Sequence, residues 1–245
     1  MGHFYLLKRK YLIAALFSIV FVLTLIYNIP SWALSSVVEN YSSGRLKFYD
    51  TEGTFWNGNG LLVAMGPKRI SSAPLMLLHW KIKLGFTKFI DIQFSVGNKK
   101  IAEVYVNSKG ANLDKLNISL SLTQVEQLFD VIKDMGVSGN INVSSDHILV
   151  GKKMAGEVKV NIDNISSGIS RVNPLGSYIV QLNAGNGDIH VSSNPGNILD
   201  LSGSGSVAGL SLEARINESH KAEMLQFITL MGVPKPNGAY QLKIF

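Results

Sequence analysis

Short runs of alternating apolar and polar residues, each bounded by glycine or asparagine, recur through this sequence and constrain its fold more than any other feature. Because successive side chains of a β-strand point to opposite faces, period-two alternation between turn residues is typical of strands and hairpins. The 23 glycines fall mostly between these runs, so we interpret them as turns. The pattern predicts an elongated, curved antiparallel β-sheet. The clearest runs begin at Leu75, Phe89, Gly139, Gly156, Ser177 and Gly209.

Two hairpins are predicted from their turn residues. Ala184–Asp188 contains an Asn-Gly pair, which tolerates the positive φ of a tight hairpin turn. Asp50–Gly60 places an aromatic pair, Phe55 and Trp56, between two glycine-containing turns. We interpret this second stretch as a hairpin at the end of the sheet that lies nearest the apolar run of residues 11–29.

Two segments break the alternation and are predicted to form short helices. In residues 123–135, Thr123 and Glu126 fit a capping box and Gly136 fits the C-terminal stop. Residues 219–231 carry a similar apolar stripe that ends before Gly232. The stripes consist of Val125, Leu128, Phe129, Ile132 and Met135 in the first segment, and of Met224, Ile228 and Met231 in the second.

Each helical segment is preceded and followed by a strand pattern, and the two segments align at an offset of 96 residues. Residues 116–143 and 209–244 therefore fit a two-fold strand–helix–strand repeat. The aligned stretch is short, which leaves duplication and coincidence both open. No linker rich in proline or serine divides the region, so residues 30–245 are predicted to be one β-rich domain.

Residues 11–29 form an apolar run of nineteen residues without a charge. As a helix rising 1.5 Å per residue, such a run spans roughly 28 Å, close to the ~30 Å hydrocarbon core of a bilayer. The basic residues 8–10 precede it, and Tyr27 and Trp32 lie at its far end. Because basic residues stay in the cytoplasm, the pattern predicts a cytoplasmic N-terminus (1–10), a single transmembrane helix (11–29) and a domain outside the cytoplasm (30–245).

A cleaved signal peptide is the alternative for the same segment, since Ser31–Ala33 is acceptable as a small-residue cleavage site. The apolar region of a signal peptide usually has only about 7–15 residues, so a retained anchor is favoured. Either interpretation delivers the remaining residues to the same side of the membrane.

The sequence offers no constellation of residues for catalysis or for binding a metal or cofactor. It contains no cysteine, which excludes disulfides, thiolate metal sites and cysteine nucleophiles. Its five histidines form neither an H-E-x-x-H nor an H-x-H pattern, and no G-x-S-x-G motif is present. The net charge of +6 falls to +3 without residues 8–10, so no nucleic-acid partner is predicted. We predict that the chain is not an enzyme and needs no cofactor.

The order of several motifs resembles the N protein of the type II secretion system. The family carries a G-T-x-W-x-G signature soon after its membrane anchor, a tryptophan like that in L-H-W-K-I, and a later Pro-Leu-Gly-x-Tyr pattern. The chain departs from the family at Phe55, where an aliphatic residue is commoner, and lacks an expected tryptophan near Ser206. The matching residues are Gly53, Thr54, Phe55, Trp56, Gly58, Trp80, Pro174, Leu175, Gly176 and Tyr178.

The resemblance covers nearly the whole chain and implies an accessory, single-pass protein of the Gram-negative inner membrane with a periplasmic C-terminal domain. Such a protein is expected to act in assembly or scaffolding of the machine that exports folded proteins across the outer membrane. Its partners would be the inner-membrane platform, the secretin, or both. The family has no catalytic residues, so no enzymatic role is implied.

Trp56 is predicted to have a structural role, because a large ring between Gly53 and Gly58 can lie across the backbone of a neighbouring strand. The alternative is an exposed anchor for a docking partner.

Two functions remain open. A scaffolding protein is expected to have one apolar sheet face and an edge strand open for β-augmentation by a partner. The alternative is a periplasmic lipid-handling module like the AsmA and lipopolysaccharide-bridge families, which hold acyl chains in an apolar groove. That alternative predicts a curved sheet whose concave face is apolar, open and larger than an ordinary surface patch.

Overall fold

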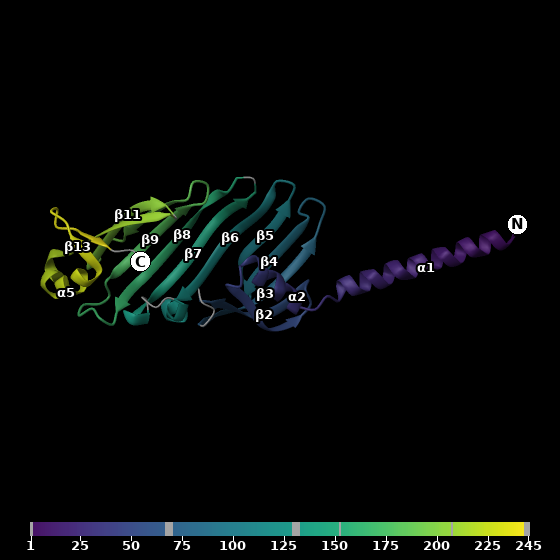
Figure 1. The fold of residues 1–245 in the computed structure, drawn as a ribbon, viewed down its shortest axis with the longest axis horizontal. Coiled ribbons are helices and arrows are strands. Elements are labelled where there is room, and N and C mark those ends of the chain that lie inside the picture. The colour runs from purple at the N-terminus through teal and green to yellow at the C-terminus, as the bar shows by residue number, and fades with distance from the viewer. Residues whose placement is uncertain (1, 67–70, 129–132, 152, 207, 243–245) are drawn as a thin grey trace.

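The computed structural model describes residues 2–66, 71–128, 133–151, 153–206 and 208–242, with only the backbone described for residues 2–12, 14 and 127. Strands dominate, and they form one fourteen-stranded sheet in which all neighbours are antiparallel. Figure 1 shows this elongated sheet with α1 (Gly2–Tyr27) projecting from one end and α5 (Lys221–Met231) at the other. The prediction of a mainly β, antiparallel fold is confirmed, and α2 (Trp32–Tyr41) is a short helix in addition to the two that were predicted.

All six alternating runs singled out in the sequence lie in strands, and the turn at Ala184–Asp188 joins two of them as a hairpin. Neighbours in sequence are neighbours in the sheet, except that the last two strands are exchanged. The strands are β1 (Leu46–Gly53), β2 (Asn57–Met65), β3 (Ser72–Leu84), β4 (Ile90–Val96), β5 (Lys99–Asn107), β6 (Gly110–Ser121), β7 (Val137–Val150), β8 (Ala155–Ser167), β9 (Gly176–Asn183), β10 (Asp188–Ser193), β11 (Leu199–Ser206), β12 (Gly209–Ile216), β13 (Gly232–Pro234) and β14 (Tyr240–Leu242). The remaining helical elements are α2 (Trp32–Tyr41), α3 (Leu122–Val125), and the 3-10 turns η1 (Glu126–Leu128) and η2 (Glu218–His220).

Two hydrophobic clusters, one near each end of the sheet, form the core. In the first, Leu34 of α2 packs with Trp80 and other residues of β1, β3 and β5. In the second, Phe227 and Ile228 of α5 pack on residues of β11 and β12. Each helix is too short to shield more than a few strands, so the two helices cover separate parts of this long sheet. The buried members are Leu34, Phe48, Leu78, Trp80, Ile82 and Ile101 in the first cluster, and Leu175, Leu199, Ala214, Met224, Phe227 and Ile228 in the second.

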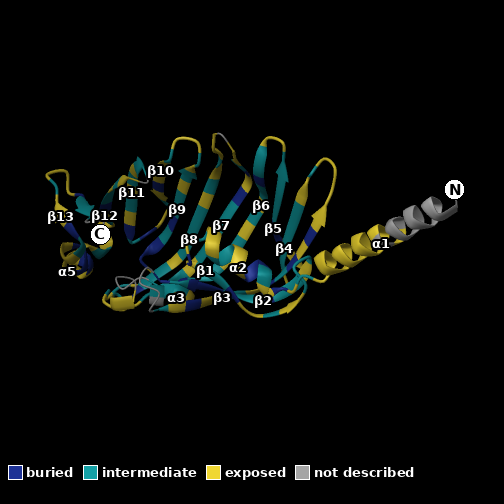
Figure 2. Cartoon of the chain, turned by 45° about the vertical axis from the view of Figure 1, so that its right-hand side comes forward, coloured by how far each residue is buried: buried dark blue, intermediate teal, exposed yellow. Residues whose placement is uncertain are grey.

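The sheet is curved, and its concave face is the apolar one. Figure 2 shows β1, β2 and β3 passing beneath the upright strands β4 to β9. Gln124 of α3, the helix that directly follows β6, accordingly donates from Nε2 to the carbonyl oxygen of Leu75 in β3 (3.4 Å), although two strands separate β3 from β6. Ile118 of β6 likewise packs against the cluster that contains Trp80 of β3. Side chains of non-adjacent strands can meet in this way only on the inner side of a bend.

The N-cap of the first helix lies two residues earlier than predicted. Ser121, not Thr123, is the N-cap. The Ser121 hydroxyl accepts from the backbone N–H of Thr123 (3.3 Å), and Gln124 Oε1 accepts from the backbone N–H of Ser121 (2.9 Å). Gln124 thus fills the position that the sequence pattern gave to Glu126. Gly136 ends the segment with φ +55°, as predicted. Phe129 and Ile132 lie outside the described residues.

The second helix is confirmed as η2 followed by α5. Met224 and Ile228 of the predicted stripe have no exposed surface, whereas Met231 is half-buried. Phe227 is also buried, although the sequence pattern did not include it. Both helices are flanked by strands, but β7 pairs directly with β6, while β14 rather than β13 pairs with β12. The duplication therefore stays a prediction.

Among the described residues, no helix is both long enough and apolar enough to cross a membrane. The side chains of residues 1–12 lie outside the described part of the chain. The transmembrane helix over residues 11–29 and the cytoplasmic position of residues 1–10 therefore stay predictions.

Within the described part of the chain, neither edge of the sheet offers a long free strand. On β1, the hydroxyl of Ser35 in α2 donates to the carbonyl oxygen of Phe48 (2.9 Å) and accepts from its N–H (3.2 Å). The Ser42 hydroxyl, at the C-cap of α2, accepts from the N–H of Leu46 (2.9 Å). The other edge, β13, has three residues and includes Pro234, which has no N–H to donate. The described residues thus do not form the long open edge strand that the scaffolding prediction expected.

Acid is expected to weaken the fold through Glu103. Its carboxylate accepts hydrogen bonds from Lys100 and from Lys88 (2.9 Å), which lower the pKa of Glu103 to about 2. Because the folded state holds the proton less tightly than the unfolded chain, this stabilisation is present above the ordinary pKa near 4.5 and is lost as the pH falls toward 2. Urea unfolding between pH 6 and about 2.5 should show the stability gap between the native protein and Glu103→Gln closing. Glu157→Gln, at an exposed position of β8, is the control, and a gap of constant size would contradict the prediction.

Candidate functional site

The loop that follows β1 joins the sheet to the end of α1. Trp56 donates from Nε1 to the carbonyl oxygen of Ile26 (2.8 Å), and the backbone N–H of Phe55 donates to the carbonyl oxygen of Ile29 (2.8 Å). Ile26 lies in the last turn of α1, where carbonyl groups have no partner within the helix. Its carbonyl oxygen also accepts from the backbone N–H of Ile29 (3.4 Å), which lies just beyond the helix. We call this set of contacts the aromatic junction. It fixes where the helix leaves the sheet.

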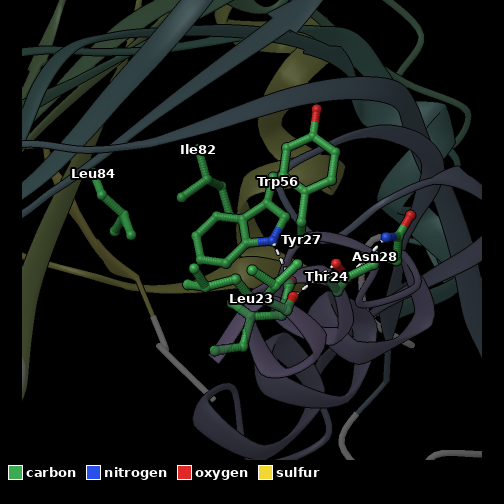
Figure 3. Close-up of a pocket in the computed structure, with 9 residues that line it drawn as sticks. Leu23, Thr24, Tyr27, Asn28, Trp56, Ile82 and Leu84 are labelled. Carbon is green, nitrogen blue, oxygen red and sulfur yellow. Dashed lines mark hydrogen bonds between the residues drawn. The ribbon is translucent and has the colours of Figure 1, made fainter. Parts of the chain in front are cut away.

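An apolar groove of about 600 Å³ lies beside the aromatic junction. Figure 3 shows Trp56, Ile82 and Leu84 on one side of it and the last turns of α1 on the other. Leu23 and Tyr27 are among the α1 residues that line it. The groove therefore lies where the apolar helix meets the sheet, and its lining suits apolar rather than charged groups.

Trp80, rather than Trp56, lies across the backbone beside the glycines. Trp80 is 1% exposed, and a Cβ on Gly58 would come within 2.7 Å of its Cζ2 atom. Its Nε1 donates to the carbonyl oxygens of Thr54 (3.2 Å) and Phe55 (3.1 Å). Gly58 is thus required because the Trp80 ring occupies the space above it. Gly53, with φ +85°, has a conformation that favours glycine and pairs with Gly58 across the hairpin.

Trp56 has a different position from the predicted one. It is half-buried, contacts the Phe55 ring edge-to-face with the ring centroids 5.2 Å apart, and bonds to the end of α1. The ring that lies over Gly58 is therefore that of Trp80, while Trp56 packs against the first core cluster, and its structural role stays a prediction.

The later motif, Pro174–Tyr178, lies at the other end of the sheet. Leu175 and Tyr178 are buried, and the Tyr178 hydroxyl donates to the carbonyl oxygen of Leu199 (2.8 Å). Gly176, at φ +157°, leaves space for the side-chain amide of Asn197, which a Cβ would strike. That amide accepts from the N–H of Ser177 (3.0 Å) and donates to its carbonyl oxygen (2.9 Å). This motif supports the second core cluster and does not contact the aromatic junction.

The described residues contain no group of three or more His, Asp or Glu side chains that would hold a metal ion. The aromatic junction consists of aromatic and aliphatic side chains and of backbone groups. These groups can pack and form hydrogen bonds, so they can hold the helix and the sheet together.

Comparison with known families finds a match over most of the chain. The family described as type II secretion system (T2SS), protein N, matches residues 45–243, which begin just before β1 and include both motifs. The chain belongs to this family. No curated protein and no solved structure gives a significant match. As a T2SS protein N, the chain is a component of the machinery for type II secretion, and the other components of that machinery are its implied partners.

In this T2SS protein N, several residues of the two sites could not be found from sequence motifs. Ile26 and Ile29 contribute only carbonyl oxygens to the aromatic junction, so no side-chain signal marks them. Asn197 follows a glycine in a turn-like stretch and looks like an ordinary turn residue. Only the fold brings it beside Gly176.

Tyr178→Phe is expected to lower the free energy of unfolding by about 1–3 kcal/mol, because it removes the partner of a buried carbonyl group. Burial, and secondarily the charge of Asp200, raise the pKa of the Tyr178 hydroxyl, so it stays protonated and donates at all physiological pH values. Urea denaturation of the full chain in detergent measures the change. Tyr41→Phe, at a residue 90% exposed, is the control, and equal effects of the two substitutions would contradict this role.

Proposed function

We propose that this chain is an accessory inner-membrane component of the type II secretion system, anchored by α1 and acting in assembly or scaffolding through its periplasmic sheet. The observation that carries the proposal is the aromatic junction. The family signature loop bonds directly to the end of α1 through Trp56 and Phe55. A sheet fixed to its anchor in this way presents its surfaces at a defined position relative to the membrane.

The exposure of apolar side chains supports the membrane anchor. In the described part of α1, large apolar side chains on every side of the helix are exposed, from Ile13 (59%) to Tyr27 (74%). Such a helix is stable only in an apolar surrounding. Phe86, which is fully exposed in the loop after β3, lies near Leu84 of the groove beside α1. Aromatic side chains at this end of the sheet suit the membrane interface.

The opposite end of the sheet is the best candidate for a docking surface. Leu230 and Val233, on and just after α5, are 74% and 52% exposed, and Leu225 is 47% exposed. Large apolar side chains grouped on a surface commonly mark a protein contact. This surface lies at the end remote from α1 (Figure 1).

Site-specific photo-crosslinking in the native host tests the proposal. A photoreactive amino acid replaces Leu230 in one variant and Lys109, exposed in the turn between β5 and β6, in the control. Adducts are identified by mass spectrometry. We expect secretion-system proteins to be enriched in the Leu230 adducts over the Lys109 adducts. Adducts without any secretion component at both positions would reject the scaffolding role.

A Trp56→Phe variant tests the aromatic junction itself. Phenylalanine keeps an aromatic ring, smaller than indole, but removes the Nε1 donor to Ile26. Spin labels on α1 and on β4 should then show a broader distance distribution. We expect crosslinking from Leu230 to weaken in the same variant, because its surface loses its fixed position. An unchanged distribution would mean that the bond does not orient the sheet.

A further inference from the structure

The strand register places aliphatic residues in continuous rows across the concave face. Residues that are directly opposite in an antiparallel sheet share a face, so each row can be traced from strand to strand. One row runs through five strands from β6 to β10, and another through four strands from β4 to β7. The rows are Ile118, Val143, Val160, Val180 and Val191, and Ile92, Val104, Leu113 and Ile148.

The opposite face of the same strands is polar. One residue along from the first row, the register gives a row without a single aliphatic side chain, namely Asn117, Ser144, Lys159, Gln181 and His190. The polar face is suited to water, whereas the apolar face needs a cover.

Among the described residues, α2 and α5 cover the two ends of the apolar face, and the short α3 contacts β3 and β7 where β6 ends. Both core clusters lie at the two ends, under α2 and under α5. Between them, Val104, Leu113, Val143, Val160 and Val180 are only half-buried. We call these five residues and the face around them the trough. Within the described residues no helix packs over the trough, so its apolar surface has no protein partner there.

We propose that the trough binds the acyl chains of a lipid. The trough lies in the middle of the sheet, where the backbone N–H and C=O groups are already used in the ladder, so a partner strand cannot add there. Its side chains offer no hydrogen bond and no aromatic or arginine anchor of the kind that protein interfaces use. Such a surface therefore suits a ligand that makes no hydrogen bonds.

The size of the trough fits an acyl chain. From β5 to β9 the strands span roughly 19 Å, given their spacing of about 4.8 Å. One leaflet, and hence one acyl chain, fills about half of the ~30 Å hydrocarbon core. An extended chain of roughly 15 Å can therefore lie across about four of these five strands.

Apolar cavities lie at both ends of the trough. At the α5 end, a cavity of about 210 Å³ is lined by Ile165, Leu201 and Phe227 among others. At the other end, the groove of about 600 Å³ lies between Ile82 and α1. Ile82 pairs with Ile92, which belongs to the row that continues into Leu113. An apolar path thus connects the anchor helix to the trough, and this continuity with a membrane-type helix favours a lipid over a soluble ligand.

Photo-crosslinking with a lipid probe tests the inference. The full chain is placed in vesicles of phosphatidylethanolamine and phosphatidylglycerol that contain phosphatidylethanolamine with a diazirine in one acyl chain. Adducted peptides are mapped by mass spectrometry. We expect adducts on trough residues of β6, β7, β8 and β9, in addition to those on α1.

Two neighbouring substitutions provide the matched pair. Val160→Glu places a carboxylate in the trough, and Asn161→Glu places the same group on the polar face of the same strand. We expect Val160→Glu to lower adduct yield in the trough about tenfold, because a carboxylate is costly to bury against an acyl chain. We expect Asn161→Glu to change it by less than about twofold.

The map of the native chain decides the question even if Val160→Glu does not fold. Adducts confined to α1, or spread equally over both faces of the sheet, would overturn the inference. A photoreactive residue at Val143 that captures a second copy of the chain, or another protein in place of lipid, would overturn it as well. None of these outcomes depends on the scaffolding role, which the Leu230 crosslinks test separately.

Discussion

Replacing Trp80 with alanine is expected to lower the free energy of unfolding by about 3–5 kcal/mol, the largest effect of any single substitution proposed for this protein. Trp80 is 1% exposed and lies at the centre of the first core cluster. Its ring centroid is 5.1 Å from that of Phe48. The substitution removes a large ring from a packed site and leaves a cavity that the surrounding strands cannot fill.

The same substitution also removes a polar contact. Without the Nε1 donor, the carbonyl oxygens of Thr54 and Phe55 lose a shared partner, and both belong to the loop that holds α1. Urea denaturation of the full chain in detergent, followed by far-ultraviolet circular dichroism, measures the loss. Trp32→Ala is the control, since Trp32 is 63% exposed. Similar shifts for the two variants would show that Trp80 does not hold this end of the sheet together.

Gly58→Ala is expected to cost about 1–3 kcal/mol although it adds a single methyl group. The new Cβ would lie 2.5 Å from the carbonyl oxygen of Glu52, 3.0 Å from that of Thr54 and 2.7 Å from Trp80 Cζ2. Two of these three atoms belong to the backbone of the same hairpin, so a side-chain movement alone cannot relieve the contact. The hairpin must open, and we expect the bonds from the loop to α1 to weaken with it.

Gly209→Ala is the matched control for this prediction. Gly209 also lies in a strand, but a Cβ there would meet no atom within 4 Å. Its substitution should be neutral or stabilising by about 0.4–1 kcal/mol, because alanine reduces the entropy of the unfolded chain. Combining Gly58→Ala with Trp80→Ala measures how much of the cost comes from the ring. Full additivity would mean that the ring contact contributes nothing.

The strands and the family signature could be predicted from sequence because both depend on local pattern. Alternation at the runs from Leu75 and Gly156 is a property of neighbouring residues, and it identifies strands without any knowledge of what they pair with. The second helix was predictable for the same reason. The N-cap of the first helix was predicted two residues too late. Ser121 and Thr123 can both act as an N-cap, and the choice between them depends on where β6 ends.

The roles of the two tryptophans could not be predicted in this way. Trp56 and Trp80 are both aromatic residues near glycines in the sequence, and nothing local distinguishes them. Register decides, because it brings Trp80 directly opposite Gly58, while the loop position of Trp56 brings it to Ile26.

By itself, the sequence determined that this chain forms an antiparallel sheet of amphipathic strands next to an apolar segment, since periodicity and hydropathy are encoded over a few residues. Only the tertiary structure decided which way the sheet bends, which ends of its apolar face the helices cover, and that no helix among the described residues packs over its centre. Those features depend on contacts between residues far apart in the chain, such as Gln124 with Leu75 and Ile118 with the Trp80 cluster. No local pattern specifies such contacts, because they arise from the curvature that the whole sheet adopts.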